Sequence, residues 1–182
     1  MKVALVQPRG SNWIPGEGDL STVVNRMAPL GLLNLAAYLE KEGVEVTVHD
    51  GLGPMAPPTL EHDVEEVLAE HPDLVGFTAT TSSFLDAAEM ARKIKNRSPD
   101  TLTVVGGVLV SSLGADLLER FDAVDYLVFG EGEQTLSEIV AGRRPEEIHG
   151  LAYRDGSRAV TTAPRERGRP KENPRTIPKH GM

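Results

Sequence analysis

Five short apolar runs alternate with segments of helical period, and this alternation limits the folds open to the chain more than any other feature. Each run has the length and composition of a buried strand. The runs cover residues 2–7, 44–49, 73–78, 101–105 and 124–129. Strands that alternate with helices form a parallel sheet with helices on both faces. We therefore predict an α/β domain.

The segments between these runs predict five helices. Several begin at a capping residue and carry apolar residues at helical spacing. The first begins at Pro29, buries Leu30, Leu33, Ala37 and Tyr38, and ends at Gly43; the second is capped by Thr59 and buries Leu60, Val64, Val67 and Leu68; the third is capped by Ser82 or Ser83, extends to Asn96 and buries Leu85, Ala88, Met90 and Ile94. A short helix at 112–120 and a helix at 133–141 complete the set. Right-handed crossovers then give a doubly wound, flavodoxin-like (Rossmann-like) five-stranded sheet of order 2-1-3-4-5.

The last thirty-five residues, 148–182, differ from the alternating part. Residues 148–154 and 158–162, separated by Asp155-Gly156, predict a β-hairpin added to the sheet edge. From Ala163 the chain carries four prolines and six basic residues and few apolar ones, which is typical of an extended or disordered tail. We therefore divide the chain into an α/β domain at 1–162 and a linker or tail at 163–182.

The chain contains no cysteine, which excludes disulfides, thiolate-ligated zinc and a cysteine-held iron–sulfur cluster. The formal net charge is −8, and the tail alone carries +4, so residues 1–162 carry −12. Such a surface argues against nucleic-acid binding. There is no apolar stretch of membrane-spanning length and no signal peptide. We expect a cytoplasmic protein that binds neither nucleic acid nor membrane.

Two turns rich in small residues follow predicted strands, at the sheet edge where ligands bind in open α/β folds. Gly106-Gly107 lets another group approach the backbone closely, although a tight turn without a ligand explains it equally well. Gly130-Glu131-Gly132-Glu133 combines two flexible positions with a carboxylate at a helix start, and a capped turn is the alternative. The two carboxylates disfavour a phosphate ligand, and neither a P-loop nor G-x-G-x-x-G occurs.

Hydroxylic residues follow the third strand in Thr78-Ala79-Thr80-Thr81-Ser82-Ser83. They could bond a polar ligand, or they could cap the next helix and form a turn. The five histidines show no metal-ligand spacing; His62 and His71 are interpreted as solvated, and His49 as a satisfied polar contact more than a ligand. We predict no catalytic residue and no protein metal ligand.

Taken together, these motifs resemble the N-terminal cobalamin (B12)-binding domain of the cobalamin-dependent radical S-adenosylmethionine (SAM) enzymes. The resemblance covers residues 2 to about 162 in the family's order and at close to its spacing. Its segments are Pro29-Leu30-Gly31-Leu32, Leu35-Ala36-Ala37-Tyr38-Leu39, Asp50, Val75-Gly76-Phe77-Thr78, Val104-Val105-Gly106-Gly107, Asp125-Tyr126-Leu127-Val128-Phe129-Gly130-Glu131-Gly132-Glu133 and Ile148-His149-Gly150-Leu151-Ala152-Tyr153-Arg154.

The resemblance implies a corrinoid, with its cobalt, at the carboxyl edge of the sheet. By this likeness Thr78, Thr80 and Ser82 line the slot for the nucleotide tail, Gly106 and Gly107 let the tail pass, and Gly130, Glu131, Gly132 and Glu133 hold its far end or the corrin rim. The Asp-x-His-x-x-Gly motif that supplies a cobalt-ligating histidine is replaced by Gln7-Pro8-Arg9-Gly10-Ser11-Asn12. Cobalamin is thus expected base-off, without a histidine ligand. Val108, which we include among the cofactor-binding residues, stands with Leu109 and Val110 where the family often has a histidine.

The family's catalysis also requires a Cys-x-x-x-Cys-x-x-Cys motif, which this chain lacks. The resemblance therefore implies a corrinoid-binding fragment or subunit that is not catalytic alone and that works with a radical SAM domain in methyl transfer or related radical chemistry. The alternative is a stand-alone degenerate domain that binds no corrinoid and acts as a protein–protein interaction or accessory module. A flavin or nucleotide binder ranks third, because aromatic residues make up only 4% of the chain.

Overall fold

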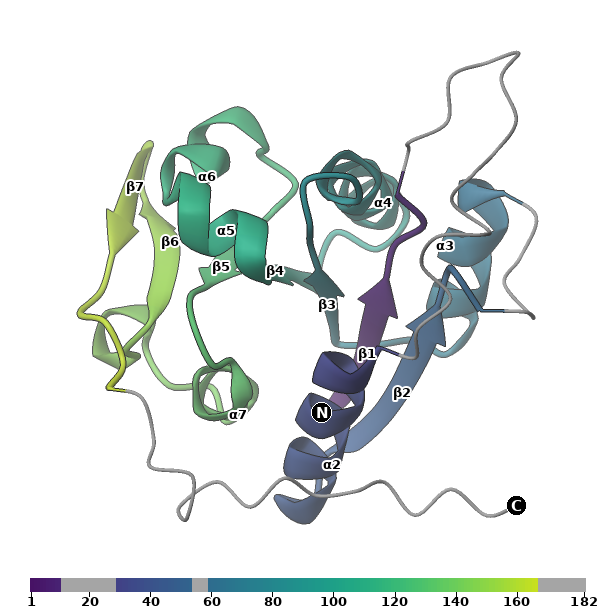
Figure 1. The fold of residues 1–182 in the computed structure, drawn as a ribbon, viewed down its shortest axis with the longest axis horizontal. Coiled ribbons are helices and arrows are strands. Elements are labelled where there is room, and N and C mark those ends of the chain that lie inside the picture. Colours follow the sequence, from purple (N-terminus) through teal and green to yellow (C-terminus); the bar gives the residue numbers. More distant parts are fainter. Residues whose placement is uncertain (11–28, 54–58, 167–182) are drawn as a thin grey trace.

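The computed structural model describes residues 1–10, 29–53 and 59–166. The described chain forms one seven-stranded sheet of order β2-β1-β3-β4-β5-β6-β7 (Figure 1). The strands are β1 Lys2–Gln7, β2 Glu45–Asp50, β3 Leu74–Thr78, β4 Leu102–Gly106, β5 Tyr126–Val128, β6 Leu151–Asp155 and β7 Arg158–Thr161. The first five are parallel, and β6 and β7 are an antiparallel hairpin beside β5. The predicted strand order and hairpin are confirmed.

Helices cover both faces of the sheet because its strand residues alternate between two apolar cores. The helices are α2 Leu30–Lys41, α3 Leu60–Ala69, α4 Phe84–Arg97, α5 Val108–Leu113, α6 Asp116–Arg120 and α7 Glu133–Val140, with a 3-10 turn at Pro145–Glu147. In β1, Val3 and Leu5 pack with α2 and α7, whereas Ala4 and Val6 pack in the core that contains α3, α4, α5 and α6. Among the described helices, α2 and α7 cover the face that carries Val3 and Leu5 (Figure 1).

The predicted buried face of α2 was wrong. Leu32, Ala36 and Leu39 are buried, whereas Leu30 is 68% exposed. This helix carries apolar residues around most of its circumference, so the helical period alone does not select the face that meets the sheet. Leu85 of α4 is likewise 61% exposed instead of buried, because its neighbour Phe84 takes the core position.

The helix starts confirm one predicted cap and correct another. The hydroxyl of Thr59 accepts a hydrogen bond from His62 N, as a capping residue does. Ser83 precedes α4 but makes no capping bond; its hydroxyl accepts from Thr80 N at 3.0 Å. The single short helix predicted at 112–120 is two helices, α5 and α6, which Gly114 separates.

Arg154 of β6 ties the hairpin to the loop after α6. Its guanidinium donates to the backbone carbonyl oxygens of Leu118 and Val124, each at 2.7 Å, and of Phe121 at 2.8 Å. We expect Arg154→Met to lower the free energy of unfolding by about 3 kcal/mol, because several carbonyl groups lose a charged donor at once. Urea denaturation measures the loss. Arg158→Met on exposed β7 is the control and should change it by less than about 0.5 kcal/mol; equal losses would contradict this role.

The chain leaves the hairpin along α7. Gly150 N donates to Ala163 O at 2.8 Å, and Arg165 Nε donates to Thr135 Oγ1 at 3.0 Å. The Arg165 guanidinium also pairs with Glu138. The first residues after β7 are thus held against α7, a helix that lines the cavity described below. Of the predicted tail, 167–182 lies outside the described residues.

Candidate functional site

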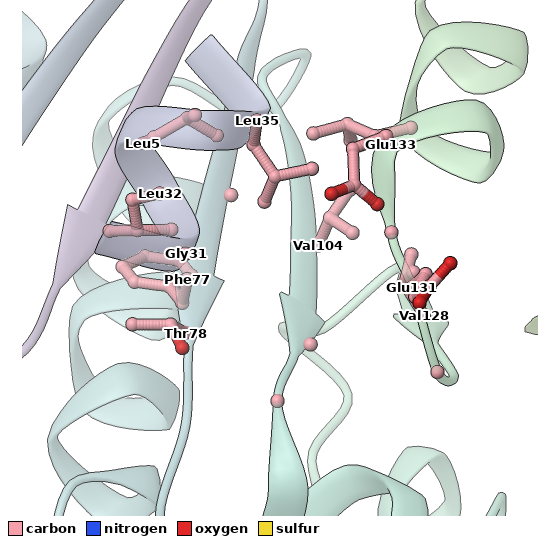
Figure 2. A pocket seen from close by; sticks show the side chains of 16 residues that line it. Leu5, Gly31, Leu32, Leu35, Phe77, Thr78, Val104, Val128, Glu131 and Glu133 are labelled. Carbon is pink, nitrogen blue, oxygen red and sulfur yellow. The ribbon is translucent and has the colours of Figure 1, made fainter. Parts of the chain in front are cut away.

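A cavity of about 230 Å³ opens between α2 and α7 at the carboxyl ends of the central strands (Figure 2). Ligands of doubly wound sheets bind at this edge, near the point where the strand order reverses. Here that point lies between β1 and β3, which are neighbours although β2 separates them in the chain. The lining residues are Leu5, Gly31, Leu32, Leu35, Gly76, Phe77, Thr78, Val104, Gly106, Gly107, Val128, Gly130, Glu131, Gly132, Glu133 and Leu136.

Glycines on β3 and β4 leave room for this cavity on the sheet surface. A Cβ atom at Gly76 would lie 3.0 Å from Cδ2 of Leu5, a residue that also lines the cavity. A Cβ atom at Gly106 would meet no atom closer than Val128 O, at 3.6 Å. Larger side chains at these two positions would extend into the cavity. An isolated glycine in a strand is a sequence signal for close approach of another group, and Gly76 could have been found by it.

Glycine occurs at position 107 for a different reason than at position 106. Its φ is +107°, and a Cβ atom there would lie 2.6 Å from Ala79 O and 2.9 Å from Ala79 N. Ala79 N donates to Gly106 O at 2.8 Å, so the loops after β3 and β4 lie against one another. The backbone packing at Gly107 therefore requires glycine whether or not a ligand is bound.

The Gly130-Glu131-Gly132-Glu133 turn forms the wall of the cavity beside α7. Gly130 has a φ of +72°, and Gly132 is the residue before α7. Glu133 is the first residue of that helix, where a carboxylate interacts favourably with the helix dipole. The predicted helix start at Glu133 is confirmed. Glu131 and Glu133 both line the cavity at this wall (Figure 2).

The rim between α2 and α7 is electronegative. The pKa of Tyr38 on α2 is raised, first by burial and then by the carboxylates of Glu42 and Glu133, while Arg165 acts in the opposite direction. Glu131 and Glu133 are the acidic residues among the cavity lining. An anionic group of a ligand would therefore lie away from this wall, and the prediction that the turn does not bind phosphate stays a prediction.

Three predicted site residues lie outside the cavity. Thr80 and Ser82 line a neighbouring groove of about 340 Å³, which shares Thr78 and Gly31 with the cavity. The Thr80 hydroxyl lies 3.0 Å from that of Ser82 and 3.1 Å from that of Ser83, so turn formation occupies part of this hydroxyl cluster. Val108, at the start of α5, is 70% exposed and lines neither space.

An ion pair fixes the turn that follows β1, beside the groove. Arg9 Nε donates to Asp63 Oδ2 at 2.6 Å, and Asp63 on α3 is buried. The hydrogen bond to this carboxylate raises the pKa of Arg9. Gly10 N donates to Asp86 Oδ2 on α4 at 2.9 Å. Sequence reasoning missed this pair because its members are far apart in the chain.

None of the four described histidines lines the cavity or the groove. His49 Nε2 is buried without a hydrogen-bond partner among the described residues, so its satisfied polar contact stays a prediction. Its nearest carboxylate oxygen is Glu70 Oε1, at 3.7 Å. In the described ranges no three His, Asp or Glu side chains form a group that could hold a metal ion. No helix in these ranges is both long and apolar enough to cross a membrane.

The fold and this cavity define a small-molecule-binding domain of the doubly wound α/β class. The chain belongs to the family described as "B12 binding domain", whose model matches residues 16–140. The predicted resemblance to the B12-binding domains of cobalamin-dependent radical SAM enzymes is confirmed.

Individual relatives agree with this assignment. The chain is 33% identical to "Uncharacterized methyltransferase PH0819" of Pyrococcus horikoshii, over 91% of this chain and 35% of that protein. It is 26% identical to "Cobalamin-dependent radical SAM methyltransferase TokK" of Streptomyces tokunonensis, over 69% of this chain and 19% of that protein. The structure of the radical S-adenosylmethionine methyltransferase TsrM from Kitasatospora setae, with cobalamin and a [4Fe-4S] cluster bound, matches with a TM-score of 0.71 and 29% identity, over 90% of this chain and 29% of that one. The chain spans about a third of these proteins or less.

Proposed function

We propose that the chain binds a corrinoid, with the nucleotide tail in the cavity and the corrin ring at the carboxyl edge of the sheet. The observation that carries this proposal is the cavity itself, which is floored by Gly76 and Gly106 and walled by apolar side chains of α2 and α7. Its volume of about 230 Å³ lies below the range of roughly 300–1,000 Å³ for sites that enclose a whole drug-sized ligand. The cavity is therefore of a size for one part of a corrinoid, its nucleotide tail, and not for the whole molecule.

The residues of the cavity would bind and orient the tail. Leu32, Leu35 and Leu136 exclude water from it, and Thr78 offers a hydroxyl at the end of β3. The neighbouring groove, with Thr80 and Ser82, continues from Thr78 toward the turn after β1. When bound, the cobalt of such a group carries a methyl group or tunes a radical reaction, while the protein supplies burial and orientation.

The corrinoid is proposed to bind base-off, without a histidine on cobalt. This agrees with the absence of a described histidine from the cavity and the groove. Since the chain has no cysteine, an iron–sulfur cluster of the kind present in TsrM would be held by another domain or subunit. We infer that this chain acts with a radical SAM domain in methyl transfer or related radical chemistry.

Reconstitution tests the binding proposal directly. Purified chain incubated with hydroxocobalamin is expected to retain about one corrin per chain after gel filtration, measured by corrin absorption. After reduction to Co(II), the electron paramagnetic resonance spectrum should lack the nitrogen splitting of an axial imidazole. A colourless, folded protein would favour the alternative, a degenerate domain that serves as an interaction module. Nitrogen splitting would contradict the expected absence of an axial nitrogen ligand on cobalt, while leaving corrinoid binding intact.

A further inference from the structure

The cavity is poor in hydrogen-bond donors on its side chains. Apart from glycines, its lining is apolar except for Thr78, Glu131 and Glu133. An ionised carboxylate only accepts hydrogen bonds, so Thr78 is the side chain among the described lining residues that can donate one at neutral pH. Glu133 lines the cavity together with the apolar residues Val104, Val128 and Leu136 (Figure 2).

The number of donors matters because the bases that terminate corrinoid tails differ in how many hydrogen-bond acceptors they carry. A displaced benzimidazole has one free ring nitrogen, a phenolic base has none, and a purine has three together with an exocyclic amine. The ring nitrogens are acceptors and require donors. The amine of a purine could donate to Glu133, but the described lining side chains offer its three ring nitrogens a single donor, Thr78. An acceptor buried without a donor weakens binding by about tenfold or more.

Resting on the proposed corrinoid function, we propose that this cavity selects the lower base of the corrinoid, accepting benzimidazole or phenolic bases and rejecting purines. Shape alone does not produce this selection, because a purine and a benzimidazole are both fused bicyclic rings of similar size. The selection comes from the donor-poor lining of Val104, Val128 and Leu136 and from the accept-only carboxylate of Glu133.

Binding titrations of the 182-residue chain with four corrinoids test the selection. The four corrinoids are cobalamin, the phenolic p-cresolyl cobamide, the adenine-containing cobamide, and cobinamide, which lacks the nucleotide tail. Equilibrium dialysis with corrin absorbance measures each Kd. We expect cobalamin and the cresolyl form to bind within about threefold of one another and the adenine form at least about tenfold more weakly. An adenine form that binds as tightly as cobalamin would overturn the selection.

The same series separates this inference from the proposed function. If none of the four corrinoids binds to the folded chain, the corrinoid function itself fails. If all four bind equally, cobinamide included, the corrin is held outside the cavity; corrinoid binding then stands and base selection falls.

A variant at Glu133 tests the cause of the selection. Glu133→Gln replaces an accept-only group by an amide that also donates. The ratio of adenine-form Kd to cobalamin Kd is expected to fall by about threefold or more, because one purine nitrogen gains a donor. Glu40→Gln, an equivalent change at an exposed position of α2, should leave the ratio unchanged. An unchanged ratio in a folded Glu133→Gln protein, with Tm near that of the parent, would remove Glu133 from the explanation.

Discussion

Replacing Gly107 by alanine is expected to destabilise the domain by roughly 2–5 kcal/mol. Two costs add at this position. The backbone has a φ of +107°, which residues with a Cβ rarely adopt, and the new Cβ would lie 2.6 Å from Ala79 O. The obstacle is backbone that is hydrogen-bonded to Gly106, so it cannot move aside cheaply. Equilibrium urea denaturation, with circular dichroism as the readout, measures the loss.

The neighbouring glycine is the matched control for this prediction. A Cβ atom at Gly106 would have no contact closer than 3.6 Å, and this residue has no positive φ. Gly106→Ala should therefore change the free energy of unfolding by less than about 1 kcal/mol. Similar losses at both positions would show that the close approach to Ala79 is not what requires Gly107.

The largest effect on binding is expected from Gly106→Leu. A leucine side chain at the end of β4 extends into the space assigned to the nucleotide tail, while Val128 leaves room for its Cβ. Cobalamin affinity should fall by about 100-fold or more, since two groups cannot occupy the same well-packed space. The protein should stay folded, because the new apolar side chain fills a cavity. Corrin retained after gel filtration reports binding, and Tm reports the fold.

A control variant must show that the loss of binding comes from the position of the new side chain and not from its added size alone. Thr161→Ile enlarges an exposed residue of β7, remote from the cavity lining, and is expected to leave cobalamin binding unchanged. If Gly106→Leu binds cobalamin normally at an unaltered Tm, the tail does not enter between α2 and α7. Corrinoid binding would then have to rest on the surface of the carboxyl edge alone.

The strand order could be predicted from the sequence because each strand is marked locally, by a short apolar run and a following turn. The faces of the helices could not be predicted as well. The α2 sequence offers several apolar faces, and the choice of Leu32, Ala36 and Leu39 depends on the sheet beneath them. At α4 the helical period alone could not show that Phe84, not Leu85, enters the core.

The candidate site shows the same division between local and distant signals. The turns that contain Gly106 and Glu133 were found because glycine and capping patterns are local. The apolar walls were missed, because Leu35 and Leu136 look like ordinary core residues until α2 and α7 are placed on one face of the sheet. The different tasks of Gly106 and Gly107 depend on Ala79, nearly thirty residues earlier in the chain, and no local pattern reveals them.

The gap between α2 and α7 has a consequence for how much folded protein a cell can keep. Side chains of one apolar core border a space that residues 1–10, 29–53 and 59–166 leave unfilled, so a bound tail would complete that core. A ligand present at a hundred times its Kd adds about 2.7 kcal/mol to the stability of the folded state. Chains made when corrinoid is scarce would unfold more often and be removed sooner by proteases. Under the proposed function, cofactor supply would thus set the abundance of this domain as well as its occupancy.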